Sequence, residues 1–289
     1  MLTISEAMDE QVRTAVKKVS STRRPFAYLV QAALAGAYIG VAVVLMVSAA
    51  GPLAQADSPW TKLVQGLVFG IALTLVVSAG GELATSNMMT LTQGAIRRSI
   101  GWGPAARTLG FSFVGNLVGA GIFAAMVHAS GVLAPTTPGG AMIAKMLATK
   151  AEEPIDQLFW RGVLCNILVC LAIWSAVRLR TEGAQLLVVF WCLLAFITSG
   201  FEHVVANMTT FSLGLIGGLP HAALADFGRN LLVVGAGNLL GGALVVGGAY
   251  ALIAGRPHGV GFGDGSPQRA GTTEAPGPVN LATLVSHSS

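Results

Sequence analysis

Residues 78–88 read Ser-Ala-Gly-Gly-Glu-Leu-Ala-Thr-Ser-Asn-Met, and residues 198–208 read Thr-Ser-Gly-Phe-Glu-His-Val-Val-Ala-Asn-Met. The two stretches align at an offset of 120 residues, with a Gly, the Glu, the Asn and the Met identical at matching places. Residues 115–119 (Gly-Asn-Leu-Val-Gly) and 237–241 (Gly-Asn-Leu-Leu-Gly) match in the same order at an offset of 122. Chance similarity between glycine-rich apolar segments is the alternative. Two matches in nearly the same register favour an internal duplication.

The composition around these motifs is that of a membrane protein. Hydrophobic residues make up 53% of the chain and charged residues only 10%, against about 25% charged residues in soluble domains. A helix needs about 20 apolar residues to cross a bilayer. Six stretches meet that length, and the second and fifth are interrupted by the motifs quoted above. We place the six spans at residues 26–49, 62–93, 105–130, 158–178, 184–214 and 228–254.

The ends of the chain differ from this apolar region. In residues 1–25, Ile4, Met8, Val12, Val16 and Val19 recur at helical spacing, and Thr3 with Glu6 fits a capping box, so we expect an amphipathic cytoplasmic helix at the membrane surface. We expect residues 26–254 to form one six-span membrane domain, and residues 255–289, rich in Gly, Pro, Ser and Thr, to be a disordered cytoplasmic tail. Most of the 17 lysines and arginines fall on the side of the N-terminus, which places both termini in the cytoplasm.

The duplication predicts the fold. Three spans in each half insert with opposite orientation, which gives an all-α membrane protein of two inverted three-helix repeats with helices 2 and 5 interrupted. Such repeats commonly hold a binding or conduction site near the midplane, between the interrupted helices.

Ionisable residues at that depth are rare and usually functional. For Glu82 and Glu202 we favour a role in holding the loops, as acceptors for backbone N–H groups. His203 has Leu83 at its matching position, and we interpret this histidine as a donor of a hydrogen bond or a proton to an anion rather than as a packed core residue.

Other residues near the interruptions admit two readings. The polar side chains of Thr85, Asn87 and Asn207 could line a polar waist. Phe69, Leu73 and Phe196 form either ordinary packing or a hydrophobic constriction.

Several other functions are disfavoured by the sequence. The cysteines Cys165, Cys170 and Cys192 lie in apolar stretches without metal-site spacing, and we expect no metal and no cofactor. The sequence has no basic patch with interleaved aromatic residues, so nothing in it indicates nucleic-acid binding. A channel for neutral solutes stays an alternative, although it lacks paired Asn-Pro-Ala motifs. A haem-containing redox enzyme would need axial ligands, and only His203 lies clearly at depth.

Residues 200–208 (Gly-Phe-Glu-His-Val-Val-Ala-Asn-Met) resemble the fifth-helix signature of the formate–nitrite transporter family. The resemblance extends through residues 70–75, 81–85 and 164–174, and residues 180–184 and 191–196 are most similar to its nitrite-channel branch. It covers roughly residues 26–254.

This resemblance implies a homopentamer of aquaporin-like protomers, each with its own pore, in a bacterial-type inner membrane. The cargo would be nitrite, in the context of nitrate assimilation, with protons as partners; formate, hydrosulfide, acetate and lactate are alternative cargoes. Ala84 stands where relatives often have phenylalanine, which would leave the inner constriction wider. The pore residues that the resemblance implies are the central histidine His203, its loop partner Thr85, the constriction residues Phe69, Leu73 and Phe196, the pore-proximal Asn166 and the vestibule lysine Lys150.

Overall fold

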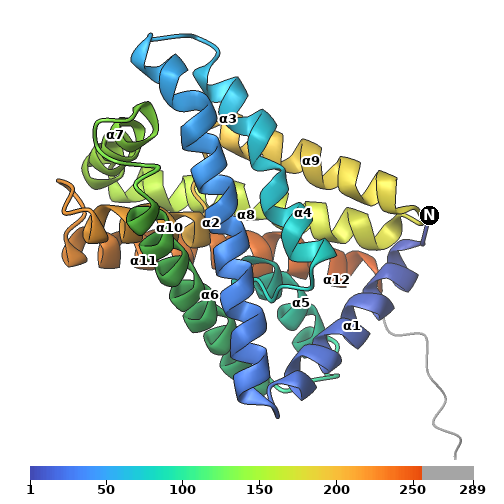
Figure 1. Cartoon of the computed structure of the whole chain (residues 1–289). Coiled ribbons are helices and arrows are strands. Elements are labelled where there is room, and N and C mark those ends of the chain that lie inside the picture. Colours follow the sequence, from blue (N-terminus) through green and yellow to red (C-terminus); the bar gives the residue numbers. More distant parts are fainter. Residues whose placement is uncertain (256–289) are drawn as a thin grey trace, which may run out of the picture. The chain divides into compact units, whose positions relative to one another are not determined.

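The computed structural model describes residues 1–255, and these residues form an all-α fold (Figure 1). The expected tail therefore lies, apart from Gly255, outside the described residues. The helices are α1 (Ile4–Ser21), α2 (Pro25–Gln55), α3 (Thr61–Phe69), α4 (Ile71–Ser78), α5 (Ala84–Ile96), α6 (Trp102–Ser130), α7 (Pro138–Glu152), α8 (Ile155–Arg178), α9 (Glu182–Thr198), α10 (Val204–Ile216), α11 (Leu224–Leu239), the π-helix η1 (Leu240–Gly248) and α12 (Ala249–Ile253).

Five helical stretches are long and apolar enough to cross a membrane: Pro25–Gln55, Thr61–Ser78, Trp102–Ser130, Ile155–Arg178 and Leu224–Ile253. The predicted spans 62–93 and 184–214 are each divided between helices, because five residues separate α4 from α5 and five separate α9 from α10. The second helix in each case, α5 or α10, has 13 residues. At about 1.5 Å per residue, such a helix covers only part of a bilayer core about 30 Å thick.

Glycines let two pairs of long helices approach closely. A Cβ atom added to Gly119 of α6 would lie 1.8 Å from the carbonyl oxygen of Ala33 in α2. One added to Gly237 of α11 would lie 2.3 Å from the carbonyl oxygen of Phe159 in α8. Small residues commonly mark such close contacts between membrane helices. The pairs α2–α6 and α8–α11 therefore pack in the same manner.

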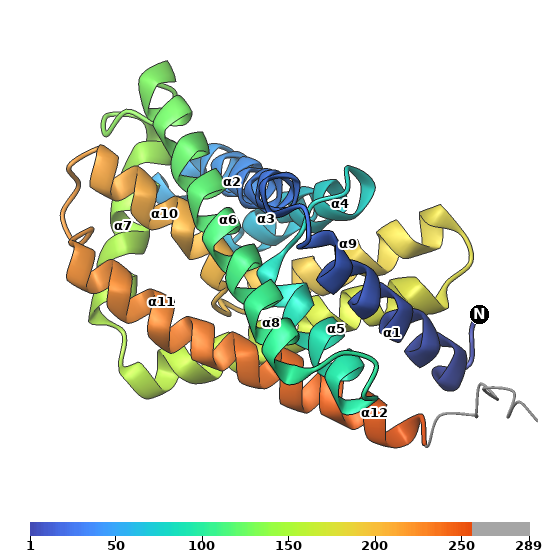
Figure 2. The ribbon, with the colours of Figure 1, turned by 90° about the horizontal axis from the view of Figure 1, so that it is seen from below.

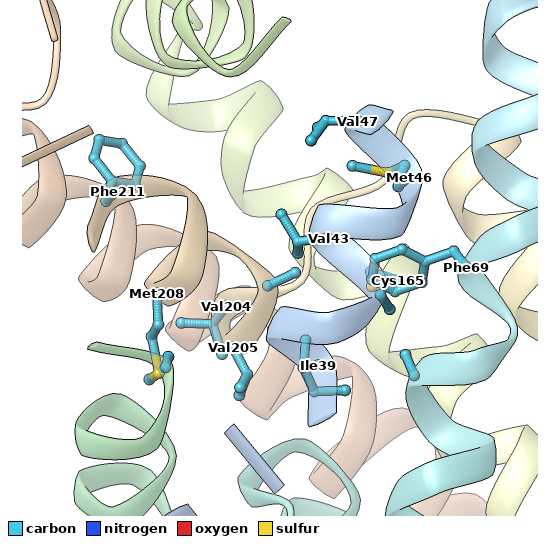
Figure 3. Packing of buried hydrophobic residues seen from close by; sticks show 14 of the residues in the cluster. Ile39, Val43, Met46, Val47, Phe69, Cys165, Val204, Val205, Met208 and Phe211 are labelled. Carbon is cyan, nitrogen blue, oxygen red and sulfur yellow. The ribbon is translucent and has the colours of Figure 1, made fainter. Parts of the chain in front are cut away.

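Part of the main buried apolar core, to which α2, α3, α8 and α10 contribute, is seen in Figure 3. Ile39, Val43 and Met46 face it from α2, and Phe69 reaches it from α3. Residues of α10 complete this region: Val204, Val205, Met208 and Phe211. The apolar side chains at the start of α10, which belong to the fifth-helix motif, are therefore buried in this core.

Helix α1 begins with the predicted capping box, in which Thr3 and Glu6 exchange hydrogen bonds. These bonds lower the pKa of the Glu6 carboxyl from its ordinary value. One face of α1 packs on α5 and α8, and the hydroxyl of Thr90 donates to Gln11 (Figure 2). The buried positions are Ala7, Met8, Gln11 and Ala15. Val16 is 41% exposed, so the apolar face expected from the sequence coincides only in part with the face that packs on the protein. The placement of α1 at a membrane surface stays a prediction.

Candidate functional site

Two buried asparagines hold the loops that separate the divided helices. Asn238 donates to the carbonyl oxygens of Gly162 and Glu202 and accepts from the backbone N–H of Val204. Asn116 donates to the carbonyl oxygens of Ala32 and Glu82 and accepts from the N–H of Ala84. The loops also contain glycines with positive φ at equivalent places, Gly80 (φ 78°) and Gly200 (φ 76°). Only glycine adopts this conformation without steric cost. Each asparagine therefore supplies hydrogen-bond partners to backbone groups of the loop that are not paired within a helix.

The Glu202 carboxylate is the acceptor in a network of buried polar side chains. The ammonium of Lys150 lies 2.6 Å from each of its oxygens, and the amide of Asn207 donates to Oε2 at 2.7 Å. Asn207 also donates to Asn230 of α11. These groups are nearly inaccessible to solvent, so the carboxylate connects α7, α10 and the loop between α9 and α10.

The Glu82 carboxylate has the equivalent surroundings in the first half. The ammonium of Lys18 lies 2.6 Å from Oε2, and Tyr28 and Asn87 donate to the same oxygen. Asn87 further contacts Ser112 of α6. Both glutamates were expected to accept from backbone N–H groups, whereas the donors to each carboxylate in residues 1–255 are a lysine and other side chains. A scaffold role for the two glutamates stays a prediction.

His203 caps α10 and contacts the start of α5. Its Nδ1 accepts from the backbone N–H of Ala206 at 3.2 Å, and its Nε2 lies 3.0 Å from the hydroxyl of Thr85. A ring nitrogen that accepts carries no proton, so the neutral ring holds its proton on Nε2. Nε2–H then donates to Thr85, and the hydroxyl proton of Thr85 is available to another acceptor. The ring plane also stacks on Phe196, with 6.1 Å between centroids.

Two cavities meet at this histidine. The outer cavity has a volume of about 400 Å³, and residues from Asp57 and Lys62 down to His203 line it. The second, of about 10 Å³, has only apolar neighbours besides His203, among them Leu73 and Leu83, and is at the lower limit of room for one water molecule. Both cavities are lined by Phe69, Phe196 and His203. The two phenylalanine rings pack edge to face at 5.7 Å, so they and the histidine form the partition.

The remaining expected site residues lie close by in different roles. Asn166 is fully buried and donates to the carbonyl oxygens of Thr85 and Asn238. It therefore contacts the backbone of the site and lines neither cavity. Ala84 is also fully buried, and its neighbour Leu83 faces the small cavity instead. Lys150 lines the outer cavity, as expected for a vestibule lysine, but its charge is paired with Glu202.

Two arginines that sequence reasoning did not single out fix the region around Lys150. Arg229 of α11 donates to the carbonyl oxygens of Lys150, Ala151 and Glu153 at the end of α7. Arg161 of α8 forms an ion pair with Glu153. Neither arginine belongs to a repeated motif, and the carbonyl partners of Arg229 lie 76–79 residues away in sequence, so no local pattern identifies that contact.

Comparison with known proteins agrees with this geometry. The family model described as Formate/nitrite transporter matches residues 5–252. The nitrite transporter NirC of Escherichia coli K12 is 43% identical over 232 residues, covering 80% of this chain and 84% of that protein.

Two solved structures are similar as well. An FNT family ion channel superposes with a TM-score of 0.81 at 38% identity, covering 86% of this chain and 98% of that one. A pentameric formate channel with formate bound superposes with a TM-score of 0.69 at 28% identity, covering 81% and 98%. With its long apolar helices, this chain is a multi-pass membrane protein, and it belongs to the formate/nitrite transporter family.

Proposed function

We propose that this chain is a channel for nitrite and similar small monovalent anions, with His203 and Thr85 at its narrowest point. The observation that carries the proposal is the 3.0 Å contact between these two side chains, of which His203 lines both cavities and Thr85 is fully buried. Similarity to a nitrite transporter at 43% identity supports nitrite as the cargo. Formate is the second candidate, because a similar solved channel has formate bound. No cofactor takes part in this proposal.

The proposed architecture has six membrane crossings in two inverted halves. The stretch α3–α4 with α5 makes one divided crossing, and α9 with α10 makes the other. The equivalent hydrogen bonds of Asn116 and Asn238, and the equivalent lysine partners of Glu82 and Glu202, support a duplicated design. A homopentamer in the cytoplasmic membrane, with both termini in the cytoplasm, completes the proposal, and the pentameric formate channel supports that assembly.

The partition presents an energy barrier that the donors at the site reduce. An unpaired anion in an apolar environment costs on the order of tens of kcal/mol, and the walls of the second cavity are mainly apolar. The free hydroxyl proton of Thr85 can replace part of the anion's hydration, and the Nε2–H of His203, which donates to Thr85, orients that hydroxyl. Helices α5 and α10 also begin here, and helix N-termini carry partial positive charge.

The tautomer of His203 distinguishes hydrogen-bond donation from proton donation. A neutral ring that gives up its Nε2 proton would become an anion, so transfer to nitrite requires a second proton on Nδ1. That proton would displace the N–H of Ala206, which Nδ1 now accepts. We therefore assign hydrogen-bond donation to the structure described, and proton transfer to a state in which the Ala206 bond is broken.

The test is nitrite flux into proteoliposomes with the internal pH recorded, for the native chain and for His203→Ala. A matched control is His128→Ala, because His128 is exposed at the end of α6 and does not line the partition. We expect saturable flux in the native protein and in the control, and a loss of at least about 10-fold in His203→Ala, since a hydrogen bond to a charged group contributes about 1.5–3 kcal/mol. Flux no greater than in empty vesicles would reject nitrite as the cargo. Faster formate than nitrite flux would establish the second candidate.

A further inference from the structure

The amide of Asn166 joins the two halves of the protein beside the contact between Thr85 and His203. Its Nδ2 donates to the carbonyl oxygen of Thr85, at the start of α5, at 3.2 Å. The same nitrogen donates to the carbonyl oxygen of Asn238 at 2.7 Å. The side chain of Asn238 in turn holds the backbone at both neighbours of His203. One amide therefore connects the backbone of Thr85 to the loop that carries His203.

The first half has no equivalent of this amide. The carbonyl oxygens of Ala32 in α2 and Gly162 in α8 accept from the equivalent asparagines of the two halves, so these two positions correspond. Four residues further along, Gly36 of α2 corresponds to Asn166 of α8. A Cβ atom added to Gly36 would lie 2.0 Å from the carbonyl oxygen of Asn116, so no side chain fits there.

The opposing helix differs between the halves in the reverse sense. Gly242 of η1 follows Asn238 by four residues, and Ala120 of α6 follows Asn116 by four residues, so Gly242 and Ala120 correspond. A Cβ atom added to Gly242 would lie 2.4 Å from Nδ2 of Asn166. The second half therefore has a glycine where the amide needs room, and the first half has an alanine where no amide is present.

We propose that Asn166 and Gly242 act together to position Thr85 against His203, without contacting the anion themselves. This inference rests on the proposed function, since it concerns how the 3.0 Å contact between Thr85 and His203 is held. Asn166 is fully buried and lines neither cavity, so it acts through the backbone of Thr85. Gly242 lies in the π-helix η1, which packs on α5 and α8, and π-helical turns are frequent at functional sites.

The experiment measures nitrite flux per folded protein, together with Tm, in variants that separate the amide from its packing. Gly242→Ala places a methyl group against the amide and should lower Tm and lower the flux about 10-fold. Gly242→Ala combined with Asn166→Gly reproduces the combination found in the first half. This double variant should have a higher Tm than Gly242→Ala, because the clash is gone, while its flux stays low. Gly248→Ala, in the same π-helix with no neighbour closer than 3.8 Å, should change neither.

A second comparison shows whether the amide acts through Thr85, and it does not depend on the folding of the double variant. Asn166→Ala is made in the native chain and in a chain that carries Thr85→Val. It should lower the flux about 10-fold in the native chain. In the chain with Thr85→Val it should change the flux less than about 2-fold, because changes that act on one contact are not additive.

Three outcomes would overturn the inference. Native flux in Asn166→Ala, or in the double variant, would show that the amide only fills space, and would leave the proposed channel intact. An equal loss of flux in Asn166→Ala with and without Thr85→Val would show that the amide acts independently of Thr85. No nitrite flux in the native protein would reject the proposed function and this inference together.

Discussion

The pairing of Lys150 with Glu202 predicts an unequal cost for removing one charge or both. The ammonium lies 2.6 Å from each carboxylate oxygen, and each side chain is 9% exposed. Removing one member of a buried pair leaves an uncompensated charge, at a cost of about 3–5 kcal/mol. Replacing both members by uncharged groups of similar volume is often close to neutral. Lys150→Met should therefore cost about 3 kcal/mol, and Lys150→Met combined with Glu202→Gln should cost less than about 1 kcal/mol.

The assay is thermal unfolding of the detergent-solubilised protein, read as the melting temperature. A loss of 1 kcal/mol lowers Tm by roughly 2–4 °C in chains of about this size, so Lys150→Met should lower it by about 6–12 °C. The matched control is Lys18→Met in the first half. Lys18 also lies 2.6 Å from its glutamate, but it contacts one oxygen only and the side chains are 15% and 16% exposed. Its loss should cost about 1 kcal/mol, near the value for partly exposed pairs.

The reasoning fails if the double variant loses as much stability as the sum of the two single variants. It also fails if Lys150→Met and Lys18→Met lower Tm equally, because burial would then not determine the cost. Flux in the double variant adds a second readout. If Lys150 only secures the loop, the double variant should retain the KM of the native protein.

Three further predictions concern the loop, the hydroxyl and the partition. Gly200→Ala places a side chain at φ 76° and should cost about 1–2 kcal/mol in thermal unfolding, whereas Gly183→Ala, with ordinary φ and no neighbour within 4 Å, should be neutral; equal effects would refute a strained loop. Thr85→Val removes the hydroxyl and should lower nitrite flux about 10-fold, while Thr85→Ser should keep it; similar flux in both would exclude the hydroxyl as a donor. Phe69→Ala should join the two cavities and admit larger anions, as measured by nitrate and lactate flux, at a cost of about 3–5 kcal/mol in stability; unchanged selectivity would show that the ring does not form the constriction.

The divided helices could be predicted from the sequence because their signal is local. Glycines, a glutamate and an asparagine inside an apolar run interrupt a helix wherever that run is placed, and the structure has loops at 79–83 and 199–203. The contact between Thr85 and His203 needed more than local signals, since 118 residues separate them. The resemblance to a known family supplied that pair.

The partners of the charged residues could not be predicted in this way. Lys18 and Glu82 are 64 residues apart, and Lys150 and Glu202 are 52 residues apart. Which lysine meets which carboxylate depends on how α1 and α7 pack, and nothing in the local sequence reports that packing. For the same reason, the resemblance implied Lys150 as a vestibule lysine without indicating its partner, which in the structure is Glu202.

The two halves supply the same scaffold, and the residue before each short helix differs between them: it is Leu83 in the first half and His203 in the second. Asn116 and Asn238 make equivalent bonds, so both loops are held in the same way. His203 caps α10 through Nδ1, whereas Leu83 at the matching position has no acceptor, and no side chain caps α5. At the start of α5, the backbone N–H of Ala84 donates to Asn116, and the hydroxyl of Thr85 lies 3.0 Å from Nε2 of His203. Two identical loops would place two histidine-capped helix starts, or two without such a cap, against each other. Because only α10 is capped in this way, the neutral ring holds its proton on Nε2 and donates it to Thr85, and the hydroxyl proton of Thr85 is then the donor that this pair can offer to an anion.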